Sequence, residues 1–288
     1  MNNKKNSVSR RDFLVKSTFA AGALGFGGVL PVQAFGNTNN KPRESDSGKV
    51  AIVTGSSRGI GRAIAKRLAT DGYKIMVNCV VNRNLAEQVV NEIKESGGEA
   101  IWLQADVREA KAVTGLFDLT EQTFGGVDVV INNAGIMKLS PFASMTDEDF
   151  DDMMDTNVKG GFNVLREAAR RVKDGGRIIS TSSSITQLKT ATYGPYAASK
   201  AALQIYSSVL AKELAGRHIS VNAISPGVVN TPLFTDGKTQ KQIQLFIQRT
   251  PHGRIGEPED IADVVAALCS ANGWWINGET VFTNGGLV

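Results

Sequence analysis

The chain has few of the residues from which metal, redox and triad sites are built. Among its 288 residues are two cysteines, Cys79 and Cys269, which stand far apart and form no C-x-x-C pair. The sequence therefore argues against a zinc ribbon or a thiol redox motif, and we interpret both cysteines as small buried apolar residues. Two histidines, His218 and His252, give little material for a metal site or a Ser-His-Asp triad, so we predict no metal site.

Most of the chain also lacks a surplus of charge, although the formal net charge is +4. That charge comes from the first 34 residues, which hold five lysines and arginines and a single aspartate. The remainder is neutral and has no basic excess of the kind that nucleic-acid binding requires, so we predict no nucleic-acid partner. Apolar residues make up 42% of the chain, which is enough for a packed core.

The first 34 residues are typical of an export signal rather than of a membrane span. Residues 9–16 (SRRDFLVK) match the S-R-R-x-F-L-x-K pattern of twin-arginine signals, and an apolar stretch follows at 19–30. This stretch is shorter than the roughly 20 residues of a spanning helix. Residues 32–34 (VQA) fit a small-residue cleavage site. We expect the twin-arginine machinery to carry the chain to the periplasm; the alternative is an uncleaved signal that serves as a membrane anchor.

The twin-arginine route carries folded proteins, so a nucleotide-binding protein could fold around its cofactor in the cytoplasm and carry it out. The scarcity of cysteine agrees with folding in a reducing compartment. Residues 36–48 are rich in Asn, Ser and Gly, and we interpret 35–48 as a flexible linker. One domain is then expected over 49–288.

Short β-rich runs alternate with helical stretches throughout that domain. This alternation predicts a single α/β Rossmann-type domain, whose doubly wound parallel sheet of about seven strands has helices on both faces. The expected strands are 49–54, 74–80, 100–104, 127–132, 177–181, 220–224 and 280–283. The first expected helix ends near residue 70, and the others span 84–96, 109–125, 146–173, 196–215 and about 258–270.

A glycine-rich turn, residues 54–61 (TGSSRGIG), lies between the first expected strand and its helix. Glycines permit a tight turn and a close approach of backbone to a pyrophosphate, and the helix N-terminus offers free N–H groups. Such a turn alone is weak evidence, but its place at the first strand-to-helix junction strengthens it. Its spacing resembles T-G-x-x-x-G-x-G, the first motif of the short-chain dehydrogenase/reductase family.

The end of the second expected strand lacks the acid that selects NAD. In NAD-binding Rossmann folds that acid takes the ribose 2′-hydroxyl, and it would repel a 2′-phosphate. Residues 78–83 (NCVVNR) hold no acid, while Arg58 and Arg83 supply positive charge. We therefore predict NADP(H), with NAD as the alternative. Arg83 has a second interpretation as a solvated residue at the start of a helix.

Tyr196 and Lys200 stand four residues apart on an expected helix and so share a face. An ammonium near a phenol lowers the phenol pKa from about 10, and such a tyrosine can exchange a proton with a carbonyl or an alcohol. The pair is common on exposed helices, but together with the glycine turn it matches the family's Y-x-x-x-K active-site motif. We assign Tyr193, just before Gly194 and Pro195, to the pocket wall or to packing.

The resemblance implies two more catalytic residues. Ser182, Ser183 and Ser184 follow the fifth expected strand, and the family's serine lies thirteen residues before the tyrosine, which selects Ser183. Its hydroxyl would stabilise negative charge on the substrate oxygen. Asn157, a poor helix former within an expected helix, resembles the family's asparagine, whose backbone holds a water that links Lys200 to solvent.

The resemblance also implies the remaining cofactor contacts. Residues 132–135 match the family's N-N-A-G motif, 226–231 match its P-G loop beside the nicotinamide carboxamide, and Asp106 opens the D-V pair that contacts adenine. The predicted cofactor-binding residues are Gly55, Ser57, Arg58, Gly59, Ile60, Gly61, Asn78, Asp106, Val107, Asn133, Ala134, Gly135, Tyr196, Lys200, Pro226, Gly227, Val229 and Thr231.

Residues 232–253 correspond to the family's substrate lid; the alternative is a surface helix hairpin. No arginine cluster in it favours an acidic or phosphorylated substrate, and its apolar residues are Leu233, Phe234, Leu245, Phe246 and Ile247. Residues 254–261 resemble a stretch of 3-oxoacyl reductase-like and glucose dehydrogenase-like members, which names no substrate. The acyl-carrier pathway is cytoplasmic, so an exported enzyme argues against it.

The resulting hypothesis is an NADP(H)-dependent oxidoreductase that interconverts a ketone or aldehyde and an alcohol by hydride transfer. The alternative is a nucleotide-binding sensor or binding module without turnover. Family members usually pair through the helices that correspond to 146–173 and 196–215, so the resemblance also implies a homo-oligomer, a tetramer or a dimer.

Overall fold

The computed structural model describes residues 47–288. The predicted signal at 1–34 and all but the last two residues of the predicted linker lie outside the described residues. The described part is built on one seven-stranded parallel sheet with the strand order β3-β2-β1-β4-β5-β6-β7. The strands are β1 (Val50–Val53), β2 (Lys74–Cys79), β3 (Ala100–Gln104), β4 (Val127–Asn132), β5 (Val172–Thr181), β6 (Ser220–Pro226) and β7 (Thr280–Thr283).

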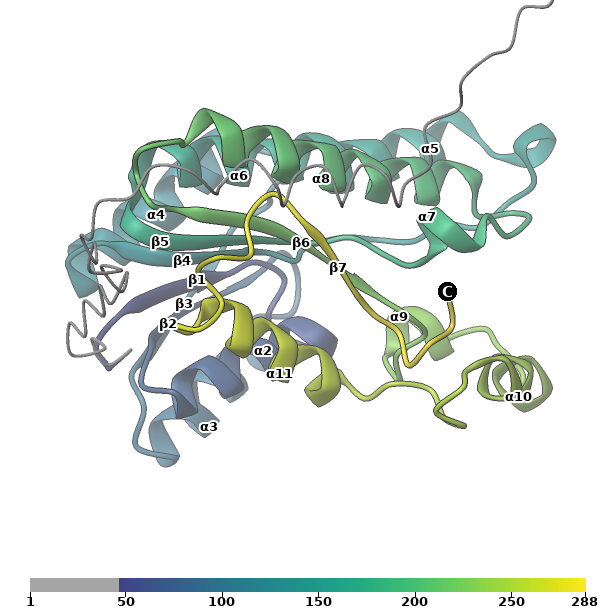
Figure 1. The fold of residues 1–288 in the computed structure, drawn as a ribbon, viewed down its shortest axis with the longest axis horizontal. Helices are drawn as coiled ribbons and strands as arrows, with labels where there is room; N and C mark the ends of the chain where they lie inside the picture. Colours follow the sequence, from purple (N-terminus) through teal and green to yellow (C-terminus); the bar gives the residue numbers. More distant parts are fainter. Residues whose placement is uncertain (1–46) are drawn as a thin grey trace, which may run out of the picture. The chain divides into compact units, whose positions relative to one another are not determined.

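Helices cover both faces of this sheet (Figure 1). One layer consists of α2 (Gly59–Thr70), α3 (Arg83–Glu95) and α11 (Pro258–Cys269). The other consists of α4 (Ala110–Phe124), α6 (Gly160–Arg171) and α8 (Gly194–Glu213). The predicted Rossmann-type α/β fold is therefore confirmed.

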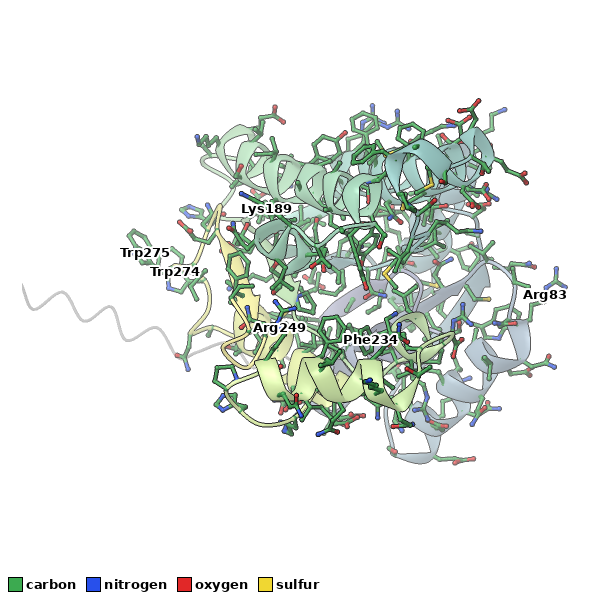
Figure 2. All side chains as sticks on the ribbon, turned by 90° about the vertical axis from the view of Figure 1, so that its right-hand side faces the viewer. Arg83, Lys189, Phe234, Arg249, Trp274 and Trp275 are labelled. Atoms are coloured by element: carbon green, nitrogen blue, oxygen red, sulfur yellow. The ribbon has the colours of Figure 1, made fainter. Side chains whose placement is uncertain are left out.

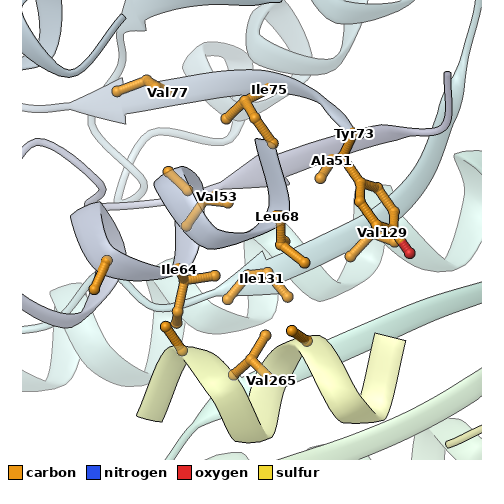
Figure 3. Packing of buried hydrophobic residues seen from close by; sticks show 14 of the residues in the cluster. Ala51, Val53, Ile64, Leu68, Tyr73, Ile75, Val77, Val129, Ile131 and Val265 are labelled. Carbon is orange, nitrogen blue, oxygen red and sulfur yellow. The ribbon is translucent and has the colours of Figure 1, made fainter. Parts of the chain in front are cut away.

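The alternation of side chains along β1 explains why both faces need cover. Ala51 and Val53 pack toward α2 and α11, whereas Ile52 between them packs toward α4 and α6. All three are fully buried, as expected for a central strand of a parallel sheet. Figure 3 shows the first of these cores, in which Ile64 and Leu68 of α2 lie between the sheet and α11.

The segment predicted as one helix at 146–173 is instead divided. It consists of α5 (Asp147–Met154), a π-helical turn at Asp155–Lys159 and then α6. The chain leaves α6 directly into β5, which begins at Val172 rather than at the predicted residue 177. Val172 pairs with Val127 and the register shifts immediately afterwards, an irregularity that periodicity does not reveal.

Short elements complete the part of the chain that the structure describes. A 3-10 turn at Phe142–Ser144 and the helix α7 (Ile185–Leu188) follow β4 and β5, and the lid contains α9 (Pro232–Thr235) and α10 (Gln240–Arg249). Within residues 47–288, no helix has the length and apolar character that crossing a membrane requires.

A tryptophan pair stands out at the β7 edge of the sheet. Trp274 is 49% and Trp275 80% exposed, and their rings meet edge to face with centroids 4.9 Å apart. Ser220 Oγ of β6 donates to the carbonyl of Trp274 at 2.6 Å, and Asn222 Nδ2 donates to that of Ile276 at 2.6 Å. The backbone beneath these rings is thus held firmly while the rings project outward (Figure 2).

Candidate active site

A cavity of about 820 Å³ opens at the carboxyl ends of the strands. It lies where the strand order reverses between β1 and β4, the position at which open α/β sheets bind ligands. Its walls come from the glycine turn, from the ends of β2, β4, β5 and β6, from α8 and from the lid. Every predicted cofactor or catalytic residue lines it except Asn78 and Asn157.

The glycine turn packs too closely against its neighbours to hold side chains at two positions. A Cβ on Gly61 would come within 2.5 Å of Asn133 Nδ2 and 2.6 Å of the Gly55 carbonyl oxygen. Gly55 itself has a φ of +62°, and a Cβ there would come within 2.9 Å of Ala134 Cα. Glycine at these positions therefore lets the turn pack against Asn133 and Ala134, and the turn itself lines the cavity.

The start of α2 is also suited to an anion. Its N-cap residue, Arg58, makes no capping side-chain hydrogen bond, and the first turn holds no acid. Free N–H groups and the positive end of the helix dipole then face the cavity. The chain's own residues therefore fit the pyrophosphate of a dinucleotide.

The structure corrects the role predicted for Asn78. Its side chain is fully buried and does not line the cavity. Oδ1 accepts a hydrogen bond from Gly55 N at 3.1 Å, and Nδ2 donates to the Ala105 carbonyl at 2.9 Å. Asn78 therefore joins the glycine turn to the loop after β3 and shapes the site without facing it.

The two arginines considered for the 2′-phosphate lie in different places. Arg58 lines the cavity at the glycine turn. Arg83 does not line it; its Nε donates to Gln104 Oε1, and the side chain points outward in Figure 2. The interpretation of Arg83 as a solvated residue at the start of a helix is the one that agrees with this geometry.

Tyr196 and Lys200 lie at the other end of the cavity on one face of α8. Tyr196 is 7% and Lys200 4% exposed. Lys200 Nζ lies 6.0 Å from the centre of the Tyr196 ring and donates to the Thr181 carbonyl at 2.9 Å. A Cβ on Gly135 would come within 3.0 Å of Lys200 Nζ, so the absence of a side chain there keeps the ammonium accessible.

Burial dominates the protonation of this pair. It raises the pKa of Tyr196 to about 12, against the opposing effect of a hydrogen bond with Ser183. Burial also lowers the pKa of Lys200 to about 8. The prediction that the ammonium brings the phenol pKa toward neutrality is therefore wrong for this structure, because removal of the phenolate from water raises that pKa and Lys200 is not among the groups that shift it.

The structure distinguishes among the three serines. Ser182 Oγ donates to the Lys200 carbonyl and Ser184 Oγ to the Ser225 carbonyl, both at 2.9 Å. Their hydroxyl protons are therefore engaged with backbone. Ser183 Oγ instead accepts from Ile185 N at 3.3 Å, and its hydroxyl lowers the pKa of Tyr196 against the effect of burial.

Asn157 lies in the π-helical turn and is fully buried behind the site. Its Oδ1 accepts from Ile136 N at 2.8 Å, and its Nδ2 donates to the Ile136 carbonyl at 2.9 Å and to Ser199 Oγ at 3.0 Å. The side chain thus fastens the segment after β4 to α8 one residue before Lys200. Such π turns are frequent at functional sites.

Sequence reasoning missed much of the apolar wall around Tyr196. Tyr193, assigned beforehand to the wall or packing, does line the cavity, and its ring meets that of Tyr196 edge to face at 6.4 Å. The residues that were missed come from loops and the short helix α7, whose few residues show no periodicity. They are Ile136, Met137, Leu139, Ile185 and Leu188.

The lid residues divide by the side of the helix on which they lie. Leu233 and Phe234 of α9 and Phe246 of α10 line the cavity. Leu245 and Ile247 do not. The hairpin therefore contributes one apolar side to the cavity and leaves the other for solvent and packing.

Known proteins resemble the chain along almost all of its described length. A family model described as Enoyl-(Acyl carrier protein) reductase matches residues 55–288. A short-chain type dehydrogenase/reductase of Picea abies is 42% identical over 251 residues, which cover 84% of this chain and 93% of that protein. An NADPH-dependent aldehyde reductase-like chloroplastic protein of Arabidopsis thaliana is 42% identical over 256 residues, with 84% and 95% covered.

Solved structures of short-chain dehydrogenases also resemble the chain. A short chain dehydrogenase from Burkholderia cenocepacia, crystallised in complex with NADP, superposes with a TM-score of 0.80. It is 36% identical, and the match covers 84% of this chain and 99% of that one.

Proposed function

The chain belongs to the short-chain dehydrogenase/reductase family and is an NADP(H)-dependent oxidoreductase that interconverts a carbonyl and an alcohol; we propose that Tyr196 is its proton donor and acceptor. One observation carries this proposal. Tyr196 is almost fully buried and lines, together with Ser183, the same cavity that the glycine turn lines, and the Ser183 hydroxyl acts on the pKa of Tyr196. A reacting carbonyl held there would meet a proton donor and a second hydroxyl together.

The glycine turn and Arg58 would hold NADP(H). The N–H groups at the start of α2 suit the pyrophosphate, and the Arg58 guanidinium suits a 2′-phosphate because residues 78–83 offer no opposing carboxylate. The segments 133–135 and 226–231 would hold the nicotinamide end. When bound, the nicotinamide supplies or accepts the hydride.

The residues around Tyr196 would handle the proton. With a pKa of about 12, Tyr196 keeps its proton at neutral pH and can give it to a carbonyl oxygen. Ser183 donates a hydrogen bond to that oxygen as negative charge grows on it. The ammonium form of Lys200 stabilises the tyrosinate left behind. Asn157 positions this group, and its backbone in the π turn is our candidate seat for a water next to Lys200.

Replacement of Tyr196 by Phe tests the proposal. We expect the rate of carbonyl reduction to fall about 10²–10⁴-fold, the usual contribution of a general acid, while NADPH binding followed by fluorescence stays within a few-fold. Tyr193→Phe is the matched control, because it removes a hydroxyl from the same wall and should leave most of the turnover.

Two outcomes would contradict the proposal in different ways. Undiminished turnover in Tyr196→Phe would show that Tyr196 is not the proton donor and acceptor. Tight NADPH binding by the unaltered protein with no turnover of any carbonyl or alcohol would favour the alternative, a nucleotide sensor or binding module.

We further propose that the protein is exported by the twin-arginine machinery and works in the periplasm. The support is the S-R-R-x-F-L-x-K match at 9–16 with the apolar stretch after it. Cleavage after Ala34 is our preferred outcome, with an uncleaved anchor as the alternative. Mass spectrometry of protein recovered from the periplasm would locate the new N-terminus.

We also propose a homo-oligomer, a tetramer or a dimer, that pairs through α6 and α8. Phe162, Ile205 and Val209 leave an exposed apolar strip on these two helices, and such strips commonly mark interfaces. Light scattering of the purified protein tests this, and a monomer at micromolar concentration would contradict it.

A further inference from the structure

The end of the cavity next to Tyr196 is apolar on its inner side. Ile185, Leu188 and Tyr193 line the cavity and also pack against Tyr196 as one hydrophobic cluster. Ile136 and Met137 belong to the same cluster and lining. A compound whose carbonyl reaches Tyr196 must therefore place its neighbouring atoms against hydrocarbon, aromatic ring and thioether surface.

The lid supplies a second aromatic wall. Phe234 of α9 and Phe246 of α10 both line the cavity, and their rings meet edge to face with centroids 5.3 Å apart at 83°. Figure 2 shows Phe234 next to the ribbon of the lid. Edge-to-face pairs of this kind readily accept a further ring.

The one lid cation that lines the cavity, Lys238, is already engaged. Lys238 Nζ lies 4.5 Å from the centre of the Phe234 ring and donates to the Phe234 carbonyl at 2.7 Å. It holds the ring in place rather than standing free for an anionic group. The other charged lid residue in the lining is Asp236, which would repel a carboxylate.

The rim of the cavity continues this apolar character. Leu139 and Leu233 are both exposed and both line the cavity. Phe142 does not line the cavity; it is 80% exposed and lies against Gly194 at the start of α8, where a Cβ would come within 2.4 Å of its ring. A sugar or a small hydroxylated aldehyde would find few hydrogen-bond partners here, and its hydroxyls would lose water without replacement.

We infer that the substrate is a bulky apolar carbonyl compound with an aromatic ring beside the reacting carbonyl, and that Phe234 and Phe246 are its specificity-determining residues. The inference rests on the proposed function and adds the substrate class. The aromatic ring would lie between Tyr193 and the lid phenylalanines, so ring contacts would contribute chiefly to substrate binding.

NADPH oxidation with four aldehydes tests the inference. The probes are 2-naphthaldehyde, octanal, propanal and glyceraldehyde. We expect kcat/KM for 2-naphthaldehyde to exceed that for octanal about tenfold and those for propanal and glyceraldehyde at least about 100-fold, in line with the discrimination that apolar pockets achieve. Octanal or glyceraldehyde at least as good as 2-naphthaldehyde would overturn the inference.

Variants of the lid separate specificity from folding. Phe234→Ala and Phe246→Ala should raise KM for 2-naphthaldehyde about tenfold, with kcat and the propanal reaction changed less than about threefold. Phe246→Leu keeps an apolar side chain and should recover part of the loss. Leu245→Ala alters the neighbouring, solvent-facing residue and should change nothing. Equal losses for both aldehydes in the Phe variants would contradict the assignment.

The same data separate this inference from the proposed function. If Tyr196→Phe abolishes turnover of whichever aldehyde is best, the function stands even where the order of the four aldehydes overturns the substrate class. If no aldehyde is reduced although NADPH binds, the function itself fails.

Discussion

Burial governs the two residues at the centre of the site. Tyr196, with a pKa of about 12, remains protonated across the range in which proteins are stable. Lys200, with a pKa of about 8, changes charge just above neutrality. Of the two, only the lysine should therefore produce a pH effect between pH 6 and 10.

The pH profile of carbonyl reduction follows from this. The Lys200 ammonium is present below about pH 8 and is lost as the pH rises, so kcat/KM should be flat below that pH and fall above it. Lys200→Arg keeps its charge throughout, because guanidinium titrates above pH 12. It should be slower but should lose the inflection near pH 8.

Steady-state rates at saturating NADPH from pH 6 to 10 measure both profiles. An inflection near pH 8 that persists in Lys200→Arg would assign it to another group. The folded state should be measured at each pH by circular dichroism, so that unfolding is not mistaken for titration.

For single residues, type and spacing were enough to predict which residues belong to the site, but not the properties that depend on the folded surroundings. The thirteen-residue spacing selected Ser183, which stays a prediction; the hydroxyls of Ser182 and Ser184 donate to backbone carbonyls. The pKa of Tyr196 and the inward position of Asn78 depend on what the fold packs around them. No spacing in the chain carries that information.

At the scale of elements, the glycine turn depends on the absence of a Cβ atom at Gly61. Gly61 is surrounded by Asn133, Gly55 and Ser56, all within 3 Å of where a Cβ would stand. Gly115, inside α4, has no atom within 4 Å of that position. The same substitution at these two helical glycines should therefore have opposite effects.

We expect Gly61→Ala to lower the free energy of unfolding by about 1–3 kcal/mol through overpacking and to weaken NADPH binding at least about tenfold. Gly115→Ala should raise the free energy of unfolding by up to about 1 kcal/mol, since alanine is the better helix former, and leave binding unchanged. Urea unfolding and NADPH titration measure both. Equal effects of the two substitutions would show that the contacts at Gly61 do not matter.

Strands and long helices were predictable to within one or two residues, because their hydrophobic periodicity is strong. β3, β4 and β7 begin and end at the predicted residues. The π turn at Asp155–Lys159 and the early start of β5 were not predicted, since both depend on neighbours: Asn157 binds Ile136, and Val172 pairs with Val127. The apolar wall escaped prediction for the same reason.

For the whole molecule, the leader is expected to decide where the enzyme works. Arg10→Lys together with Arg11→Lys should retain the protein in the cytoplasm of a bacterial host that has a twin-arginine translocase. Activity in the cell extract should persist, because the site lies wholly within residues 55–246. Fractionation followed by an NADPH oxidation assay measures this.

Lys4→Gln with Lys5→Gln is the matched control, since it removes positive charge nearby and leaves the arginine pair intact. Periplasmic activity should survive it. An unchanged periplasmic share in the arginine variant would remove the export proposal and leave the assignment of the site untouched.

The exposed tryptophan pair gives the protein an unusual optical property. Of its three tryptophans, Trp102 lies half-buried in β3 at one sheet edge, and Trp274 and Trp275 project from the β7 side. We therefore expect iodide to quench Trp274 and Trp275 more strongly than the half-buried Trp102. Denaturation changes the surroundings of Trp102 far more than those of the pair, so the emission wavelength should follow unfolding at the β3 edge. Iodide quenching should instead report a molecule that covers Trp274 and Trp275 on the β7 side.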